Sequence, residues 1–442
     1  MESLIYSAVL VGLESRRVEI NARFVPGTPG LSIAGVSEAV AREIRVRVQS
    51  AFDASGYDLP AKRCLVEVCG LEGASPSASL DLPIAVAVAV TAGYVPAEAY
   101  LGATVIGELR LDGLVRAPRG LIAHARQMLF DGDAGVLIAA ADGVALPPGL
   151  DVRDVATLRE ALDPAHRRAP VPPTPAKEGH APDLAEIRGH ARAKRALEIA
   201  AAGHHSLLLI GPPGVGKTML ARRLPGLMPE MGTSERCELQ TIQDASGRTL
   251  SAGRPFRAPH HTASLQALLG GGPRNLLGEI TLAHLGVLFL DEITEFRLRD
   301  LEQVFMAAKT GRVLWRGDVR LPADVLIVGA ANPCPCGYKD STTRLCCCTP
   351  AALTTHDRRL AAIRKMFDLV VYLEGPISTK GETGETSEAV QTRVTQSHVC
   401  PAESLLSEES AAPIAHTIAC LESASCVTAE HMDEARSFLA SE

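Results

Sequence analysis

A glycine-rich stretch near the middle of the chain limits the possible folds more than any other feature. An apolar run, Leu207–Ile210, is followed directly by Gly211-Pro-Pro-Gly-Val-Gly-Lys-Thr218. This segment matches the pattern G-x-x-x-x-G-K-[ST], in which glycines let the backbone turn tightly so that successive N–H groups face phosphate oxygens. The order of strand, loop and helix predicts an α/β fold that binds a nucleoside triphosphate.

Each position of this loop has an expected part in holding ATP and Mg²⁺. Lys217 neutralises the β- and γ-phosphate oxygens, and Thr218 holds the magnesium ion. The helix expected over Met219–Leu224 turns its first N–H groups towards the phosphates. The backbone that lines the phosphates is contributed by Gly211, Pro212, Pro213, Gly214, Val215, Gly216, Lys217 and Thr218.

A second apolar run supplies the other half of the expected site. Gly286-Val-Leu-Phe-Leu-Asp-Glu292 predicts a buried strand that ends in two carboxylates. Asp291 is placed to hold Mg²⁺ through water, and Glu292 to orient and deprotonate the attacking water. An acidic pair after an apolar run can also mark the end of a strand without any functional role. The intact loop upstream favours the functional interpretation.

Length, charge and hydropathy restrict the class of protein. A chain of 442 residues exceeds one ordinary domain, and its formal net charge of −7 argues against a protein coated with basic surface. Contact with nucleic acid would therefore need a local patch or a ring of subunits. The run Leu80–Ala92 is too short to span a bilayer, and the first residues lack a basic signal-peptide start. We expect a cytoplasmic protein without membrane contact.

The amino-terminal block resembles a known domain. Residues 1–162 alternate short β-like runs with helical stretches, which indicates one α+β domain. The resemblance is to the amino-terminal domain of ComM/YifB-type magnesium-chelatase-like AAA+ ATPases, which has a Lon-protease-like (ribosomal S5 domain 2-like) fold. It rests on Gly35-Val-Ser-Glu-Ala-Val-Ala-Arg-Glu43, Leu80-Asp-Leu-Pro-Ile-Ala-Val86 and Gly107-Glu-Leu-Arg-Leu-Asp-Gly-Leu-Val115.

This resemblance also implies a division of the chain. We expect the Lon-protease-like domain over residues 1–162 and a Pro-rich linker over 163–183. A magnesium-chelatase-type AAA+ core with a phosphate-binding loop should follow over 184–376, and a reduced helical lid over 377–442. Proteolysis is not expected. Ser77 stands where a Lon-type protease would have its serine nucleophile, but Ile122 stands at the position of the activating lysine.

Further stretches of the core resemble the same family. Gly253-Arg-Pro-Phe-Arg-Ala-Pro-His-His-Thr-Ala-Ser264 and Gly278-Glu-Ile-Thr-Leu-Ala-His284 are similar to its signatures. For His260 and His261, structural hydrogen bonds or nucleic-acid contact are favoured over metal binding. The resemblance implies that Asn332, at the end of the strand expected over Val325–Ala331, faces the γ-phosphate and the catalytic water.

A hairpin is predicted over Arg312–Leu321, turning at Gly317-Asp318. It carries Arg312, Arg316, Arg320 and the only tryptophan, Trp315. Arginines and an aromatic ring suit contacts with phosphates and bases. An edge hairpin with solvated charges is the alternative, and the sequence leaves both open.

The last part of the chain departs from the family pattern. Where the family carries an arginine that acts on the neighbouring subunit's nucleotide, this chain has Met366, and the lid arginine is replaced by His416. Arg364 lies two residues before Met366, roughly 200° around a helix, so it could substitute only after a backbone rearrangement. The sequence therefore supports nucleotide binding better than rapid turnover.

Five of the eleven cysteines lie between Cys334 and Cys348. Two C-x-C pairs, Cys334/Cys336 and Cys346/Cys348, could form a four-thiolate zinc site with Cys347 left over. The spacing differs from the usual C-x₂-C, and reduced cysteines in a surface loop are the alternative.

The resemblance implies an ATPase that forms a homo-oligomeric ring, expected to be a hexamer, and remodels DNA in recombination or natural transformation. Two alternatives remain: an ATP-responsive scaffold with little hydrolysis, and a chelatase-type motor that acts on a partner protein.

Overall fold

The computed structural model describes residues 2–71, 78–132, 135–172, 182–248, 253–271, 276–315, 319–339, 344–373, 385–397 and 410–439. The chain divides into two compact units. The first consists of Met1–Ala176 with Gln240–Leu250, and the second of Lys177–Leu239 with Ser251–Glu442.

The described part of the first unit contains a seven-stranded sheet with the order β3-β4-β2-β1-β5-β8-β9. The β1–β2 and β2–β4 pairs are antiparallel, whereas β3–β4, β1–β5, β5–β8 and β8–β9 are parallel. The alternation of short strands and helices that was expected over residues 1–162 is confirmed for the described residues. Its elements are β1 (Glu2–Val11), β2 (Glu14–Val25), β3 (Gly30–Ala34), α1 (Glu38–Ser55), β4 (Arg63–Cys69), α2 (Asp81–Ala92), β5 (Ala103–Val105), β6 (Glu108–Leu109), β7 (Val115–Arg116), α3 (Leu121–Phe130), β8 (Val136–Ala139), β9 (Asp151–Asp154) and α4 (Leu158–Leu162).

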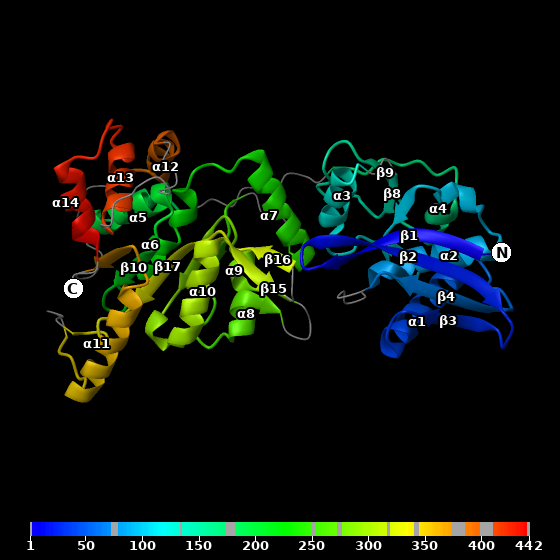
Figure 1. Cartoon of the computed structure of the whole chain (residues 1–442), viewed down its shortest axis with the longest axis horizontal. Helices are drawn as coiled ribbons and strands as arrows, with labels where there is room; N and C mark the ends of the chain where they lie inside the picture. The colour runs from blue at the N-terminus through cyan, green and yellow to red at the C-terminus, as the bar shows by residue number, and fades with distance from the viewer. Residues whose placement is uncertain are drawn as a thin grey trace. The chain divides into compact units, whose positions relative to one another are not determined.

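Helix α2 forms the centre of the first unit's core. Eleven of its twelve residues are buried, because it packs on β1 and β2 and is covered by α1 and α4. Asp81, its first residue, is fully buried and accepts two hydrogen bonds from the guanidinium of Arg47 on α1. A buried carboxylate is tolerated only when it is paired in this way. Figure 1 shows α2 beside the long β1–β2 hairpin.

The described part of the second unit contains a five-stranded sheet with the order β11-β14-β17-β10-β18, in which every neighbouring pair is parallel. The strands β10, β14 and β17 are completely buried, which is typical of a parallel sheet covered on both faces. The predicted α/β class is confirmed for this unit. Its strands are β10 (Leu207–Ile210), β11 (Phe256–Arg257), β12 (Gly270–Gly271), β13 (Leu276–Leu277), β14 (Val287–Leu290), β15 (Arg312–Trp315), β16 (Val319–Pro322), β17 (Leu326–Ala331) and β18 (Leu369–Tyr372).

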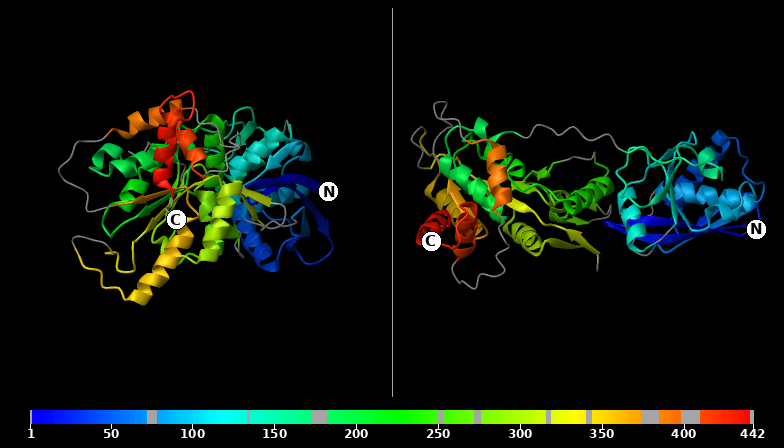
Figure 2. Two further views of the ribbon diagram at one scale, coloured as in Figure 1. Left: turned by 60° about the vertical axis from the view of Figure 1, so that its left-hand side comes forward. Right: turned by 90° about the horizontal axis from the view of Figure 1, so that it is seen from above.

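Helices pack on this sheet and on one another. Helix α5 contacts β18 and also α12 and α13, and α14 packs on α13. Figure 1 and the left view of Figure 2 show that α11 projects from the rest of this unit. The helices are α5 (Ala191–Gly203), α6 (Lys217–Ala221), α7 (Thr233–Ser246, whose end belongs to the first unit), α8 (Leu265–Leu269), α9 (Glu279–Leu282), α10 (Leu298–Thr310), α11 (Pro350–Arg364), α12 (Ser387–Gln396), α13 (Ala412–Leu421) and α14 (Ala429–Phe438).

One predicted helix begins later than the sequence pattern suggests. The apolar residues of Ile187–Ala201 are spaced as on one face of a helix, which predicts a helix that begins at Ile187, but α5 begins at Ala191. Gly189 and His190 both have positive φ, 74° and 54°, and this left-handed backbone cannot be part of a right-handed helix.

Among the described helices, none combines the length and the apolar character needed to cross a membrane.

Candidate nucleotide-binding site

The glycine-rich loop joins β10 to α6. Gly214 and Gly216 have φ values of 78° and 96°, a conformation that glycine adopts without steric cost. A Cβ atom on Gly211 would lie 2.9 Å from the carbonyl oxygen of Leu373, so the loop and the end of β18 approach closely. Gly216 precedes the first residue of α6, which directs the N-terminus of that helix towards the loop. This backbone has the form that a phosphate cradle requires.

Lys217 lies under the loop and is almost completely buried. Its Nζ atom donates to the carbonyl oxygens of Gly211 and Pro212 at 2.6 and 3.0 Å, and to Oδ1 of Asn332 at 3.0 Å. Burial lowers the pKa of Lys217 to about 8, although the carboxylates of Asp291 and Glu292 act in the opposite direction. The site therefore holds a lysine whose charge is sensitive to pH in the neutral range.

Thr218 and Asp291 meet beside the lysine. The Thr218 hydroxyl donates to Oδ2 of Asp291 at 3.2 Å, and Asp291 directly follows β14. A hydroxyl and a carboxylate offer the hard oxygen ligands that Mg²⁺ prefers. The donor set therefore fits the metal ion of a nucleotide–magnesium complex.

Glu292 has an unusual backbone conformation. Its φ and ψ angles are 49° and 45°, in the left-handed region, and its N–H donates to Oδ1 of Asp291 at 2.9 Å. A non-glycine residue in this region is uncommon, and such residues cluster at functional sites. The exposed carboxylate of Glu292 lies 3.2 Å from Nδ1 of His261.

Asn332 is held from both sides at the end of β17. Its side chain accepts the hydrogen bond from Lys217, and its carbonyl oxygen lies 3.0 Å from Nε2 of His356 on α11. These contacts link the phosphate loop, β17 and α11 through one residue.

The parallel sheet explains why these residues meet. β17 lies between β14 and β10, and the side chains in question follow the carboxyl end of each of these strands. Carboxyl ends of parallel strands lie at one edge of a sheet, where ligands of open α/β folds bind. The structure thus brings together Lys217, Thr218, Asp291 and Asn332, with Glu292 adjacent. The catalytic and binding roles of these residues stay predictions.

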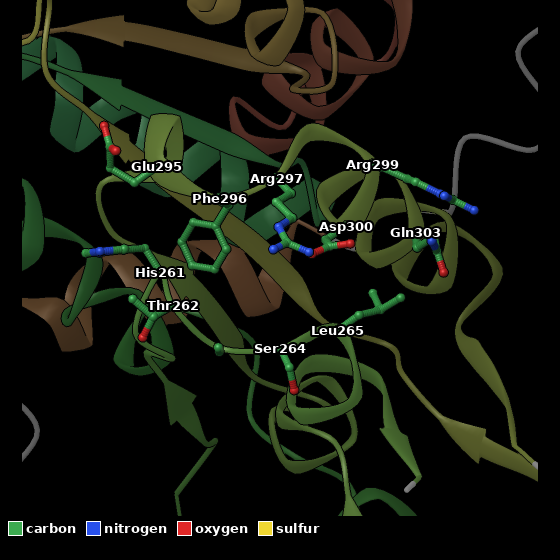
Figure 3. A pocket seen from close by; sticks show the side chains of 11 residues that line it. His261, Thr262, Ser264, Leu265, Glu295, Phe296, Arg297, Arg299, Asp300 and Gln303 are labelled. Atoms are coloured by element: carbon green, nitrogen blue, oxygen red, sulfur yellow. The ribbon is translucent and has the colours of Figure 1, made fainter.

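The pairing of His261 with Glu292 was not predicted from the sequence. The two residues are far apart in the chain, and only the adjacency of β11 and β14 brings their segments together. His261 also lines a pocket of about 790 Å³ between the segment before α8 and the start of α10. Figure 3 shows His261, Phe296 and Arg297 around this pocket.

The structure describes only one of the two positions that correspond to the catalytic dyad of a Lon-type protease. Ile122, which stands where the lysine of a protease dyad would be, is buried on α3. Ser77 lies outside the described residues.

The predicted hairpin is confirmed as β15 and β16, paired antiparallel. Trp315 is only 4% exposed and faces the same side as the buried Val313, so its ring offers no free face for stacking on bases, and both interpretations of the hairpin stay open. Arg312 and Arg320 are exposed on the opposite face with Leu314. Arg316 and the expected turn at Gly317-Asp318 lie outside the described residues.

The two positions that depart from the family pattern are both half-buried. Met366 follows α11, and His416 lies on α13 within 3.9 Å of the Cys420 sulphur. Arg364, the possible substitute, has its guanidinium carbon 5.8 Å from the centre of the Tyr372 ring.

Comparisons with known proteins show the family to which this chain is similar. The family model described as magnesium chelatase, subunit ChlI, matches residues 183–379, and a second ChlI model matches residues 18–142. YifB of Salmonella typhimurium is 34% identical over 90% of this chain and 81% of its own length. An uncharacterized Mycobacterium tuberculosis protein is 37% identical over 77% of this chain and 71% of its own length. The competence protein ComM of Haemophilus influenzae is 32% identical over 89% of this chain and 81% of its own length. The chain belongs to the magnesium-chelatase-like family of AAA+ ATPases that includes YifB and ComM.

Proposed function

We propose that this protein binds ATP with Mg²⁺, assembles into a homo-oligomeric ring such as a hexamer, and uses hydrolysis to remodel DNA. The convergence of Lys217 and Asn332 with the Thr218–Asp291 pair carries this proposal. Lys217 neutralises the phosphates, Thr218 and Asp291 hold the metal ion, and Glu292 activates water. A bound Mg²⁺ ion would neutralise negative charge on the phosphate groups.

The DNA remodelling is proposed to serve recombination or natural transformation, and the name of one relative, competence protein ComM, supports the role in transformation. The net charge of −7 requires that contact with DNA be local. Arg312 and Arg320, on the exposed face of the β15–β16 hairpin, provide a positive patch of that kind. In this proposal residues 1–162 form a Lon-protease-like scaffold without a protease dyad, and residues 377–442 form the helical lid.

A DNA-stimulated ATPase assay tests the proposal. We expect turnover to rise with DNA, to vanish in Lys217→Ala, and to vanish in Glu292→Gln while ATP binding persists. The double variant Arg312→Glu, Arg320→Glu should lose the stimulation by DNA but keep the basal rate. Arg436→Glu, another exposed arginine of the second unit, is the matched control. Equal turnover with and without DNA would count against a DNA motor and would favour a motor that acts on a partner protein.

A second candidate is an ATP-responsive scaffold with little hydrolysis. It is favoured by Met366 and His416, which stand where arginines would couple hydrolysis between subunits. This candidate predicts tight ATP binding and assembly with negligible turnover, whether or not DNA is present.

A further inference from the structure

Four cysteines lie together directly after Asn332. The Sγ atoms of Cys334, Cys336, Cys346 and Cys348 are all within 4.8 Å of one another. Cys334 is 3.4 Å from Cys336 and 3.7 Å from Cys346, and Cys336 is 3.5 Å from Cys346.

Core packing does not explain this cluster. Only Cys334 of the four is fully buried, and Arg344, Leu345 and Cys347 in the same loop are exposed. Within the described residues between Ala331 and Pro350, the chain forms no helix or strand. A loop with so little apolar burial gains its fixed shape from another source.

The distances between the sulphur atoms fit one tetrahedral metal ion. Zinc–sulphur bonds of about 2.3 Å place the sulphurs of a tetrahedral site roughly 3.8 Å apart. An iron–sulphur cluster distributes its cysteine ligands over separate iron atoms and so over larger separations. We propose that Cys334, Cys336, Cys346 and Cys348 bind a structural Zn²⁺ ion.

Backbone groups around the cluster support this proposal. The N–H of Cys336 lies 3.3 Å from the Cys348 sulphur, and the N–H of Lys339 lies 3.2 Å from the Cys334 sulphur. Such hydrogen bonds stabilise the negative charge that thiolates bring to a metal centre and fix their orientation. Cys347 is exposed and does not belong to the group.

The same loop touches the phosphate loop. Gly337 has a φ of 84°, and a Cβ atom at this position would lie 2.5 Å from Cδ of Pro213. The loop also joins Asn332 to α11, whose His356 contacts the Asn332 carbonyl group. The zinc ion therefore closes a loop that supports both Pro213 and Asn332. The link between the zinc ion and nucleotide binding rests on the proposed function, whereas the metal site itself does not.

Metal content tests the site itself. The full chain is purified without a metal-affinity tag, and its zinc is measured by mass spectrometry. We expect one zinc ion per chain, lost in Cys336→Ser and Cys346→Ser and retained in the matched control Cys347→Ser. Replacement of zinc by Co²⁺ in the wild-type protein should give the absorption bands of a tetrahedral thiolate site, which does not depend on how well a variant folds. Zinc-free protein, iron with sulphide, or equal loss in Cys347→Ser would overturn the proposal.

ATP affinity tests the link to the phosphate loop. Zinc is removed with a chelator, and the chelator is then exchanged for a buffer that contains Mg²⁺. ATP binding should be weakened several-fold by this treatment, and added zinc should restore it. Gly337→Ala should keep the zinc but weaken ATP binding, because its methyl group meets Pro213. If zinc removal leaves ATP affinity unchanged, the link is wrong and the metal site stands. If no form of the protein binds ATP, the proposed function fails while the zinc content still reports on the four cysteines.

Discussion

Lys217 is the residue whose protonation should control nucleotide affinity. Its pKa is lowered from the ordinary lysine value to about 8, with burial as the main cause. The charged form binds phosphate, so affinity should be full below this pKa and should fall as the pH rises through it. We expect the Kd for ATP to rise about tenfold between about pH 7 and about pH 9, as measured with a fluorescent nucleotide. Lys217→Arg, which stays charged, should abolish this dependence. A flat profile for the wild-type protein would contradict the prediction.

His261 should restrain Glu292. Its ring nitrogen lies 3.2 Å from a Glu292 oxygen, so the carboxylate has to leave this contact before it can orient the attacking water. An exposed contact of this kind contributes up to about 1 kcal/mol. His261→Ala should therefore raise kcat for ATP hydrolysis about fivefold with little change in nucleotide affinity. His260, which contacts Thr262 instead, provides the control through His260→Ala. A fall in kcat would show that His261 aligns the carboxylate rather than restraining it.

At the scale of elements, Arg195 on α5 holds the C-terminal helices. It pairs with Glu434 of α14 at 2.9 Å and with Glu422, just after α13, at 2.8 Å, and it also contacts the buried Glu198. Removing one partner of a fully buried ion pair costs about 3–5 kcal/mol. The Arg195 side chain keeps 25% exposure, so we expect a loss of about 2 kcal/mol for Arg195→Ala.

Thermal unfolding of the second unit measures this effect. The midpoint should fall by roughly 5 °C in Arg195→Ala, and limited proteolysis should release α13 and α14 earlier. Asp433→Ala is the control, because Asp433 is 76% exposed in its pair with Arg436. Such surface pairs contribute about 0–1 kcal/mol. Equal shifts in the two variants would show that the Arg195 contacts do not hold these helices.

At the scale of the whole molecule, turnover should depend on arginines that act between subunits. A trans arginine contributes on the order of 10³–10⁵ in rate. We expect Met366→Arg combined with His416→Arg to raise kcat at least about tenfold. The gain should appear only at protein concentrations at which analytical ultracentrifugation detects the oligomer. Lys365→Arg with His416→Arg places the new arginine one residue away and should not reproduce it. No gain in the first variant would refute the account of these two positions.

The phosphate loop, the strands on either side of the site and the acidic pair could be predicted because their signals are local. Leu207–Ile210 was predicted as a strand from its apolar run alone, and the loop after it from the positions of glycine, lysine and threonine. The predicted start of α5 was wrong because apolar spacing carries no information about the positive φ of His190.

What only the tertiary structure decided is which distant residues meet. The order of the parallel strands sets β14 and β17 beside one another and β10 next to β17, so Asn332 reaches Lys217. The pairing of β11 with β14 likewise brings His261 to Glu292, and the packing of Gly337 on Pro213 joins the cysteine loop to the phosphate loop. Local sequence encodes which backbone conformations and ligand atoms are available. Their convergence depends on strand order and on side-chain burial, as the inward-facing Trp315 illustrates, and both are properties of the folded chain.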